Sequence, residues 1–265
     1  MILLRLGAQW VWRCGRPSGR ISSLPSTEMR ILVTRPQPDA DQTAELLRAR
    51  GHDAIVCPLM EIVPSSAPEN LNAQEFQAIL ITSANGVRAF AQATPARDMR
   101  MFTVGAASAE AARKEGFTHV ESAEGDVGTL AALVGQSLDP VAGKLLHVAG
   151  SVTAGDLSGI LGSYGFEIEK MTLYQAKTAD ILPVIAKNGL QRQEFDAVVL
   201  FSPRTARIFT DLVGQAGLAE YLGNITAFCL SPAVAGGLNS EDFLDVRVSY
   251  TPDHPGILEV IDAHP

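Results

Sequence analysis

Two serines that directly follow apolar runs are the first side chains in this sequence that could do chemistry. Ser83 follows the run 78–82, Ser202 follows the run 197–201, and a helix-like segment begins after each serine. A serine at such a place is a favoured helix N-cap, which stabilises a helix by about 1 kcal/mol without any other role. Its hydroxyl, beside the unpaired amides of a first helical turn, is equally suited to an anionic ligand. Both interpretations stay open, and no G-x-S-x-G nucleophile motif surrounds either serine.

Two further turns open helix-like segments with small residues that let a ligand approach the backbone. They are Gly105-Ala106-Ala107-Ser108 and Ser231-Pro232-Ala233. None of the four turns contains the G-x-G-x-x-G fingerprint or a phosphate-binding P-loop. A nicotinamide or nucleotide cofactor is therefore disfavoured. The sequence also lacks CxxC and HExxH motifs and its five histidines are dispersed, which argues against a metal site.

Charged and phenolic side chains lie near the same turns. Arg35 and Arg204 fall within turns, where a guanidinium could pair with carboxylates. Arg88 and Arg207 fall on expected helix faces, where a solvated role is the simpler expectation. Tyr174 ends the apolar strand 171–174; its phenol either caps the core with the hydroxyl in water or donates a hydrogen bond or proton while staying neutral beside anions.

The elements that carry these turns occur twice. Residues 76–90 align without a gap on residues 195–209, and 102–109 resemble 228–235. A third pair relates 30–51 to 144–165, and each member of that pair ends at a glycine. Strands alternate with helices throughout, which predicts an α/β fold with parallel sheets covered on both faces. The serine-bearing turns then lie at the carboxyl ends of strands, where open α/β sheets bind ligands. Two similar halves predict two facing domains with a ligand between them.

Composition limits the partners and the compartment. The chain has 265 residues, 46% of them hydrophobic and 19% charged, which is typical of a compact protein with room for two cores. Its net charge of −8 argues against nucleic acid, which requires a basic surface. No apolar run approaches the roughly 20 residues that span a bilayer, so no membrane partner is expected. Three scattered cysteines favour a reducing compartment, and we expect a cytoplasmic monomer.

The first 28 residues differ from the rest. They contain both tryptophans and four arginines but only one acidic residue. Arginines interrupt any apolar segment of a secretory signal. An organellar transit segment and a misassigned start before Met29 remain the alternatives, and the second is the simpler. We expect residues 1–28 to lie outside the working fold.

Several segments, in this order and spacing, resemble the uroporphyrinogen-III synthase family. The resemblance runs from Met29 to about Ile261 and is carried by the segments 31–36, 81–87, 104–109, 171–175 and 200–203. It implies two similar flavodoxin-like domains with parallel sheets, a two-stranded linker and a ligand cleft between the domains. The implied division places 29–58 and 177–265 in one domain and 69–168 in the other, with linkers at 59–68 and 169–176.

The resemblance also implies an activity in tetrapyrrole and haem biosynthesis. Members of the family cyclise hydroxymethylbilane to uroporphyrinogen III with loss of water and inversion of ring D, using no cofactor. The family's tyrosine falls on Tyr174, which is then the catalytic residue. The implied substrate-binding residues face the cleft: Arg35, Ser83, Ala84, Asn85, Ser108, Ser202, Arg204 and Ser231. A transient contact with hydroxymethylbilane synthase, which makes the substrate, is also implied.

The sequence departs from the family pattern at three turns. A common threonine is Ser108 here, which keeps a hydroxyl, whereas the matching threonine of the last turn is Val234, which loses it. The Arg-Gly pair often found after the second half's first strand is Ala149-Gly150, which weakens carboxylate pairing there. Two alternatives to the synthase are a two-lobed anion-binding protein without catalysis, and a glycosyltransferase-like or nucleotide-binding enzyme. The second would need an acidic metal-binding pair or a phosphate loop, and neither is visible.

Overall fold

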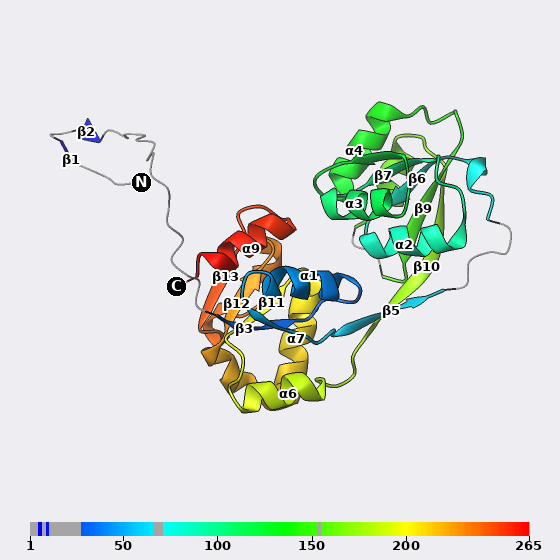
Figure 1. Ribbon diagram of the computed structural model, residues 1–265. Coiled ribbons are helices and arrows are strands. Elements are labelled where there is room, and N and C mark those ends of the chain that lie inside the picture. The colour runs from blue at the N-terminus through cyan, green and yellow to red at the C-terminus, as the bar shows by residue number, and fades with distance from the viewer. Residues whose placement is uncertain (1–4, 7–8, 11–27, 66–70, 153–154, 265) are drawn as a thin grey trace.

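The chain forms two α/β domains joined by a narrow connection (Figure 1). The computed structural model describes residues 5–6, 9–10, 28–65, 71–152 and 155–264. Within the first 28 residues it shows only a short antiparallel pair, β1 (Arg5–Leu6) with β2 (Gln9–Trp10). The other residues of the segment expected to lie outside the fold, 1–4, 7–8 and 11–27, are outside the described residues.

Domain 1 is built on a five-stranded parallel sheet in the order β13-β12-β11-β3-β4. Its strands are β3 (Arg30–Val33), β4 (Asp53–Val56), β11 (Ala197–Leu200), β12 (Thr226–Cys229) and β13 (Asp245–Val248). Its helices are α1 (Asp39–Arg48), α6 (Val184–Gln191), α7 (Pro203–Gln215), α8 (Pro232–Ala235) and α9 (His254–Asp262), with 3-10 turns η2 (Ala219–Asn224) and η3 (Ser240–Asp242).

The central strands of domain 1 are apolar along their whole length because helices cover both faces of the sheet. All four residues of β11, Ala-Val-Val-Leu, are buried. Alternate residues belong to two different cores: Val198 and Leu200 pack with α6 and α7, whereas Ala197 and Val199 pack with α1 and α9. The domain is thus a three-layer sandwich.

Domain 2 repeats this architecture on a six-stranded sheet in the order β5-β10-β9-β6-β7-β8. Its parallel strands are β6 (Phe76–Ile81), β7 (Arg100–Thr103), β8 (His119–Ser122), β9 (Lys144–Gly150) and β10 (Ile168–Thr178). One core lies under α2 (Ala84–Ala93) and α3 (Ala106–Lys114), and the other under α4 (Val127–Ser137) and α5 (Leu157–Ser163). A 3-10 turn, η1 (Ala73–Glu75), precedes β6.

The connection is a two-stranded antiparallel ladder, as expected. Strand β5 (Met60–Pro64) pairs with the second half of β10, from Tyr174 opposite Pro64 to Thr178 opposite Met60. The first half of β10 pairs with β9 inside domain 2. Strand β10 therefore continues out of domain 2 without a break. It ends at Thr178, four residues beyond Tyr174, where the sequence predicted the end of the strand. The partner strand accounts for the extension, because it satisfies backbone groups that would otherwise face water.

The sequence repeats occupy equivalent places in the two sheets. Strands β6 and β11 correspond, as do β7 and β12, and β9 and β3. Read in one direction, the orders β8-β7-β6-β9-β10 and β13-β12-β11-β3-β4 match strand for strand. The domains are circular permutations of one another in chain order, since the strands that come first in domain 2 match those that come last in domain 1.

Each sheet has one point where the winding of the chain reverses, and open α/β sheets bind ligands at such points. In domain 1 it lies between β3 and β11, and in domain 2 between β6 and β9. The residues just beyond these strands include Arg35 and Ser202 in domain 1 and Ser83 in domain 2, and Gly150 is the last residue of β9. None of the helices in the described part of the chain is long and apolar enough to cross a membrane.

Candidate functional site

Tyr174 and Ser83 meet at the switch point of domain 2. The Tyr174 phenol oxygen lies 2.8 Å from Ser83 Oγ, although the two residues are 91 positions apart. Ser83 is the N-cap of α2, and its Oγ accepts a hydrogen bond from the Gly86 amide at 3.0 Å. The capping role and the contact with Tyr174 therefore coexist, because a hydroxyl has two acceptor lone pairs and one proton.

Gly150 makes room for the tyrosine ring. A Cβ at this position would lie 2.7 Å from Tyr174 Cζ and 2.9 Å from its hydroxyl oxygen. Gly150 pairs with Tyr174 across the β9–β10 ladder, so the phenol lies over the end of β9 on its way to Ser83. Any side chain at Gly150 would compete with the ring for this space.

The other predicted serines differ in capping role and in exposure. Ser202 caps α7, where its Oγ accepts from the Thr205 amide at 3.0 Å and lies 2.8 Å from Thr205 Oγ1. Ser231 precedes α8, but its side chain accepts no capping hydrogen bond from the helix. Ser108 lies in the first turn of α3 and is buried, with 6% of its surface exposed. Its hydroxyl is thus less accessible than the others.

Arg35 sits in a polar cluster on the cleft side of domain 1. Its guanidinium nitrogens lie 3.3 Å from Asp39 Oδ2 and 2.7 Å from His254 Nε2, and the guanidinium stacks 4.1 Å from the centroid of the Phe201 ring. Burial lowers the pKa of Arg35 from its usual value, and Asp39 opposes that shift. Burial and the adjacent Arg35 lower the pKa of His254, which leaves a neutral imidazole that accepts the arginine's hydrogen bond.

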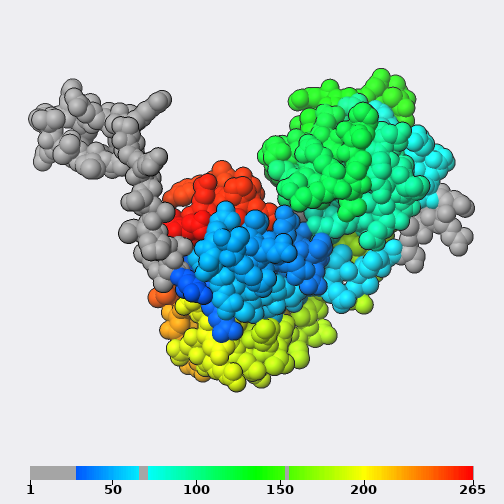
Figure 2. All heavy atoms as spheres, in the orientation of Figure 1, coloured from blue at the N-terminus to red at the C-terminus, as the bar shows by residue number. Residues whose placement is uncertain are grey.

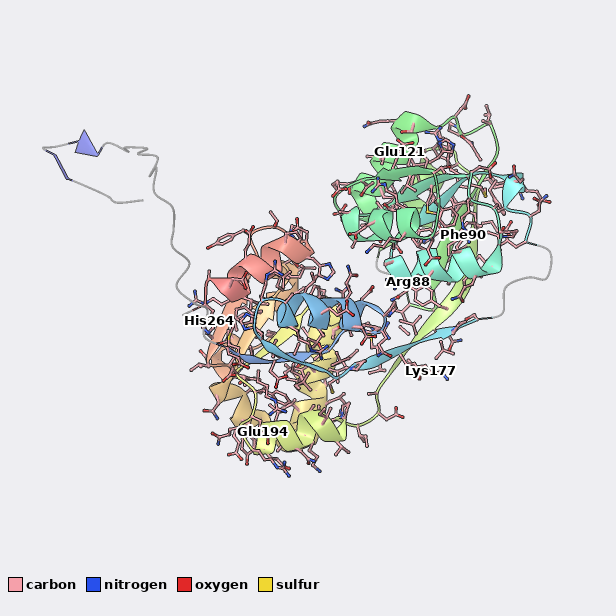
Figure 3. All side chains as sticks on the ribbon, viewed as in Figure 1. Arg88, Phe90, Glu121, Lys177, Glu194 and His264 are labelled. Carbon is pink, nitrogen blue, oxygen red and sulfur yellow. The ribbon has the colours of Figure 1, made fainter. Side chains whose placement is uncertain are left out.

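Arg88 connects the two domains, and Asn85 of the same helix holds it in place. Arg88 Nη1 donates to Asn85 Oδ1 at 2.8 Å within α2, and Arg88 Nη2 pairs with Asp39 Oδ1 of α1. Figure 3 shows Arg88 on the face of domain 2 that points toward domain 1. The solvated role expected for Arg88 from its place on a helix face is therefore wrong, because the opposite domain supplies a carboxylate that no local pattern reveals. Arg204 donates instead to the Ala176 carbonyl at 3.0 Å, which ties α7 to the linker ladder.

A cavity of about 200 Å³ lies between the domains, and several of the residues described above line it. Domain 1 contributes Arg35, Pro38, Asp39, Gln42 and His254, and domain 2 contributes Ala84, Arg88, Ala107, Glu110, Ala111, Lys114 and Glu115. In Figure 2 the domains approach each other beside α1, and a groove separates the red C-terminal segment from the green surface of domain 2. The first residue of α2, Ala84, lines this cavity, and so does one face of α3 from Ala107 to Lys114.

Two residues of the site were missed from sequence. Asp39 was not singled out because an acidic residue in a first helical turn is usually explained by the helix dipole alone. His254 follows Asp253, an N-cap whose Oδ1 accepts from the Gly256 amide at 2.8 Å, and nothing local pairs it with Arg35 some 219 residues earlier. The four-residue spacing of Arg35 and Asp39 was a local signal for that pair, and no local signal marked His254.

A family model described as Uroporphyrinogen-III synthase HemD matches residues 41–259 of the chain. This chain belongs to the uroporphyrinogen-III synthase family. It is 23% identical to a uroporphyrinogen-III synthase of Chlorobaculum parvum over 238 residues, which cover 84% of this chain and 93% of that protein. It is 26% identical to a porphyrin biosynthesis protein HemD of Ruminiclostridium josui over 220 residues, or 75% of this chain. The match covers only 43% of the length of the Ruminiclostridium protein.

Solved structures of family members share the fold. A mutant uroporphyrinogen III synthase of Thermus thermophilus superposes with a TM-score of 0.57 at 18% identity, over 87% of this chain and 96% of that one. A uroporphyrinogen-III synthetase of Helicobacter pylori gives a TM-score of 0.57 at 14% identity, over 87% of this chain and 97% of that one. The expected α/β class with two parallel-sheet domains is thus confirmed.

Proposed function

We propose that this chain is a uroporphyrinogen-III synthase, which converts hydroxymethylbilane to uroporphyrinogen III. Membership of the family supports the activity. The observation that carries the assignment is the position of Tyr174, whose phenol reaches Ser83 at a sheet switch point beside the gap between the domains. No nucleotide fingerprint competes with this interpretation in the sequence.

The reaction needs little covalent chemistry from the protein. The hydroxymethyl group of the substrate takes up a proton and leaves as water, and the pyrrole nitrogen's electrons form an azafulvene. The substituted carbon of ring D attacks this electrophile and forms a spiro intermediate. The intermediate fragments and closes again with ring D inverted, and the proton lost on rearomatisation balances the proton used for the leaving water. The protein's main task is to hold the chain in the geometry that favours this attack over end-to-end closure.

Tyr174 is the residue that we propose to assist the leaving hydroxyl. Ser83 Oγ already accepts from the Gly86 amide, so its own proton is free to be donated to the Tyr174 oxygen. The phenol proton is then available for the hydroxyl of the substrate, either as a hydrogen bond or by transfer. Gly150 keeps the ring in the position from which this donation is made.

The carboxylates of the substrate require many donors over a wide surface. The first turn of α2, after Ser83, presents amides at the carboxyl end of its strand, and the helix dipole favours anions there. Helices α7 and α8 begin with Pro203 and Pro232, which have no N–H, so they offer fewer first-turn amides. The cavity of about 200 Å³ is smaller than pockets for drug-sized ligands, which range over roughly 300–1,000 Å³. A linear tetrapyrrole is larger than this cavity, so it must extend into the groove between the domains or widen it.

The remaining features of the proposal concern organisation. The domains comprise 29–58 with 177–265, and 69–168, with linkers at 59–68 and 169–176. The protein acts as a cytoplasmic monomer without a cofactor, and it receives its unstable substrate through transient contact with hydroxymethylbilane synthase. Arg35, Ala84, Asn85, Ser108, Ser202, Arg204 and Ser231 complete the proposed substrate-binding surface with Ser83.

An isomer assay tests the proposal. Purified protein is mixed with freshly prepared hydroxymethylbilane without added metal, and the porphyrins obtained after oxidation are separated by chromatography. We expect the type III isomer in excess over the type I isomer, which forms without enzyme. Type I alone, together with saturable binding of the substrate, would favour the two-lobed binding protein instead.

A further inference from the structure

The carboxylate of Asp39 lies between two arginines that come from opposite domains. Asp39 Oδ2 is 3.3 Å from Arg35 Nη2 of its own domain, and Asp39 Oδ1 pairs with Arg88 Nη2 of domain 2. Among the described residues, the pair formed by Asp39 and Arg88 is the one ion pair that joins the two domains. Both oxygens of the carboxylate are thus used, one by each domain.

Both guanidinium groups are held in place from behind by neutral acceptors. Asn85 Oδ1 accepts from Arg88 Nη1 at 2.8 Å, and His254 Nε2 accepts from Arg35 Nη1 at 2.7 Å. The side chains are partly withdrawn from water, with exposed fractions of 14% for Arg35, 13% for Asp39 and 23% for Arg88. A carboxylate between prearranged, partly desolvated guanidiniums is bound more firmly than one in an exposed pair.

The cavity beside Asp39 has balanced charge only because Asp39 is present. Arg35, Arg88 and Lys114 line it, as do Asp39, Glu110 and Glu115. Lys114 Nζ pairs with Glu110 at 2.8 Å, so this lysine is already compensated within α3. Among the ion pairs of the described residues, Glu115 pairs with neither arginine, so both arginines depend on Asp39 and would present an unfilled anion site to the cavity without its charge.

We propose that Asp39 occupies the place of a substrate carboxylate in the ligand-free protein, and that Arg88 is the anion-binding side chain for which the two carboxylates compete. The identity of the ligand as a polycarboxylate rests on the proposed function. Binding a carboxylate at Arg88 breaks the ion pair that links the domains, so ligand entry and domain separation become one exchange. The return of Asp39 favours release of the product. Asp39 thus lowers affinity and promotes turnover.

The direct test measures anion binding without the reaction. Isothermal titration calorimetry at low ionic strength uses butane-1,2,3,4-tetracarboxylate as the probe, with the 265-residue chain. Asp39→Asn keeps the shape of the side chain and removes the competing charge, so we expect it to bind the probe at least about tenfold more tightly than the wild type, which equals about 1.4 kcal/mol. Arg88→Gln, alone or combined with Asp39→Asn, should bind no more tightly than the wild type.

Asp41→Asn is the matched control, because Asp41 is an exposed acid in the same first turn of α1 and does not line the cavity. It changes the net charge by the same amount, and we expect less than a twofold change in affinity. Equal gains in Asp41→Asn and Asp39→Asn, or a gain that persists with Arg88→Gln, would overturn the proposal. Should Asp39→Asn fail to fold, as judged by thermal unfolding, Asp39→Ser carries the same expectation.

A kinetic measurement tests whether the competition at Arg88 also affects turnover of the proposed substrate. With hydroxymethylbilane, Asp39→Asn should lower KM and lower kcat, with a burst of product in the first turnover, because the product then leaves more slowly. An unchanged or higher KM would contradict the competition. A failed isomer assay with wild-type protein would refute the proposed activity and leave the calorimetric result intact, so the two hypotheses fail separately.

Discussion

A methyl group added at Gly150 would test whether the position of Tyr174 matters for turnover. Gly150 has no positive φ, so alanine fits its backbone and only space decides the outcome. The new Cβ would lie 2.7 Å from Tyr174 Cζ, 2.8 Å from Cε2 and 2.9 Å from the hydroxyl oxygen. Ordinary contacts begin at 3.4 Å, so the ring must retreat by about 0.7 Å. The 2.8 Å contact with Ser83 cannot keep both its length and its direction after such a shift.

Displacements approaching 1 Å at a reacting group lower rates by up to about 100-fold. We therefore expect Gly150→Ala to lower kcat by about 10- to 100-fold, with a stability loss of about 1–3 kcal/mol from overpacking. The assay is steady-state formation of the type III isomer, with thermal unfolding to confirm that the protein is folded. Gly162→Ala in α5 is the control, since nothing lies within 4 Å of its added Cβ.

The reasoning has a sharper check in a double-mutant cycle. If Gly150 acts through the phenol, adding Gly150→Ala to Tyr174→Phe should lower kcat only slightly further, so the two effects are not additive. Full additivity would show that Gly150 acts by another route. A folded Gly150→Ala protein with wild-type kcat would refute the claim that the ring position is important.

Three further outcomes follow from individual side chains. Tyr174→Phe should lower kcat by at least about 100-fold while the protein stays folded, with a stability loss of about 1 kcal/mol from the lost contact with Ser83, because the phenol proton is lost and the ring is kept; undiminished turnover would remove Tyr174 from the mechanism. Burial lowers the pKa of His147 to about 4 from 6.5, so the folded protein resists protonation that the unfolded chain accepts. Stability should be complete above pH 6.5 and fall by up to about 3 kcal/mol toward pH 4 in urea titrations, and His147→Leu should flatten this dependence. Burial raises the pKa of Cys57 to about 11 and that of Cys229 to about 12, so in a Cys14→Ser protein at about pH 8 neither thiol should react with a disulfide reagent until denaturant is added; rapid labelling of the native protein would contradict their burial.

The alternation of strands and helices was readable in the chain because it is a local property. Apolar runs such as 197–201 and glycines such as Gly51 mark where elements begin and end, and Gly51 does adopt a positive φ of 89° after α1. The duplication also indicated two similar domains. The strand order of the sheets could not be predicted, because it depends on pairings between segments far apart in the chain. The circular permutation follows from the strand order, so it could not be predicted either.

The candidate site, like the fold, was only partly predictable from sequence. The capping roles of Ser83 and Ser202 depend on the three residues that follow each of them, and local sequence was enough to suggest them. The partner of Arg88 is supplied by another domain, so its helix position suggested solvent where the structure has a carboxylate. The role of Gly150 depends on a tyrosine on the neighbouring strand.

The amino-acid order by itself determined the α/β class, the repeated units and the serine-capped turns between strands and helices. These features arise from interactions within a few residues, namely helix capping, apolar periodicity and glycine conformation. Only the tertiary structure decided which turns face one another and which charges pair across the gap between the domains. Those contacts join residues far apart in the chain, such as Asp39 and Arg88, and they form only when the two domains are packed against each other, so no short stretch of sequence shows them.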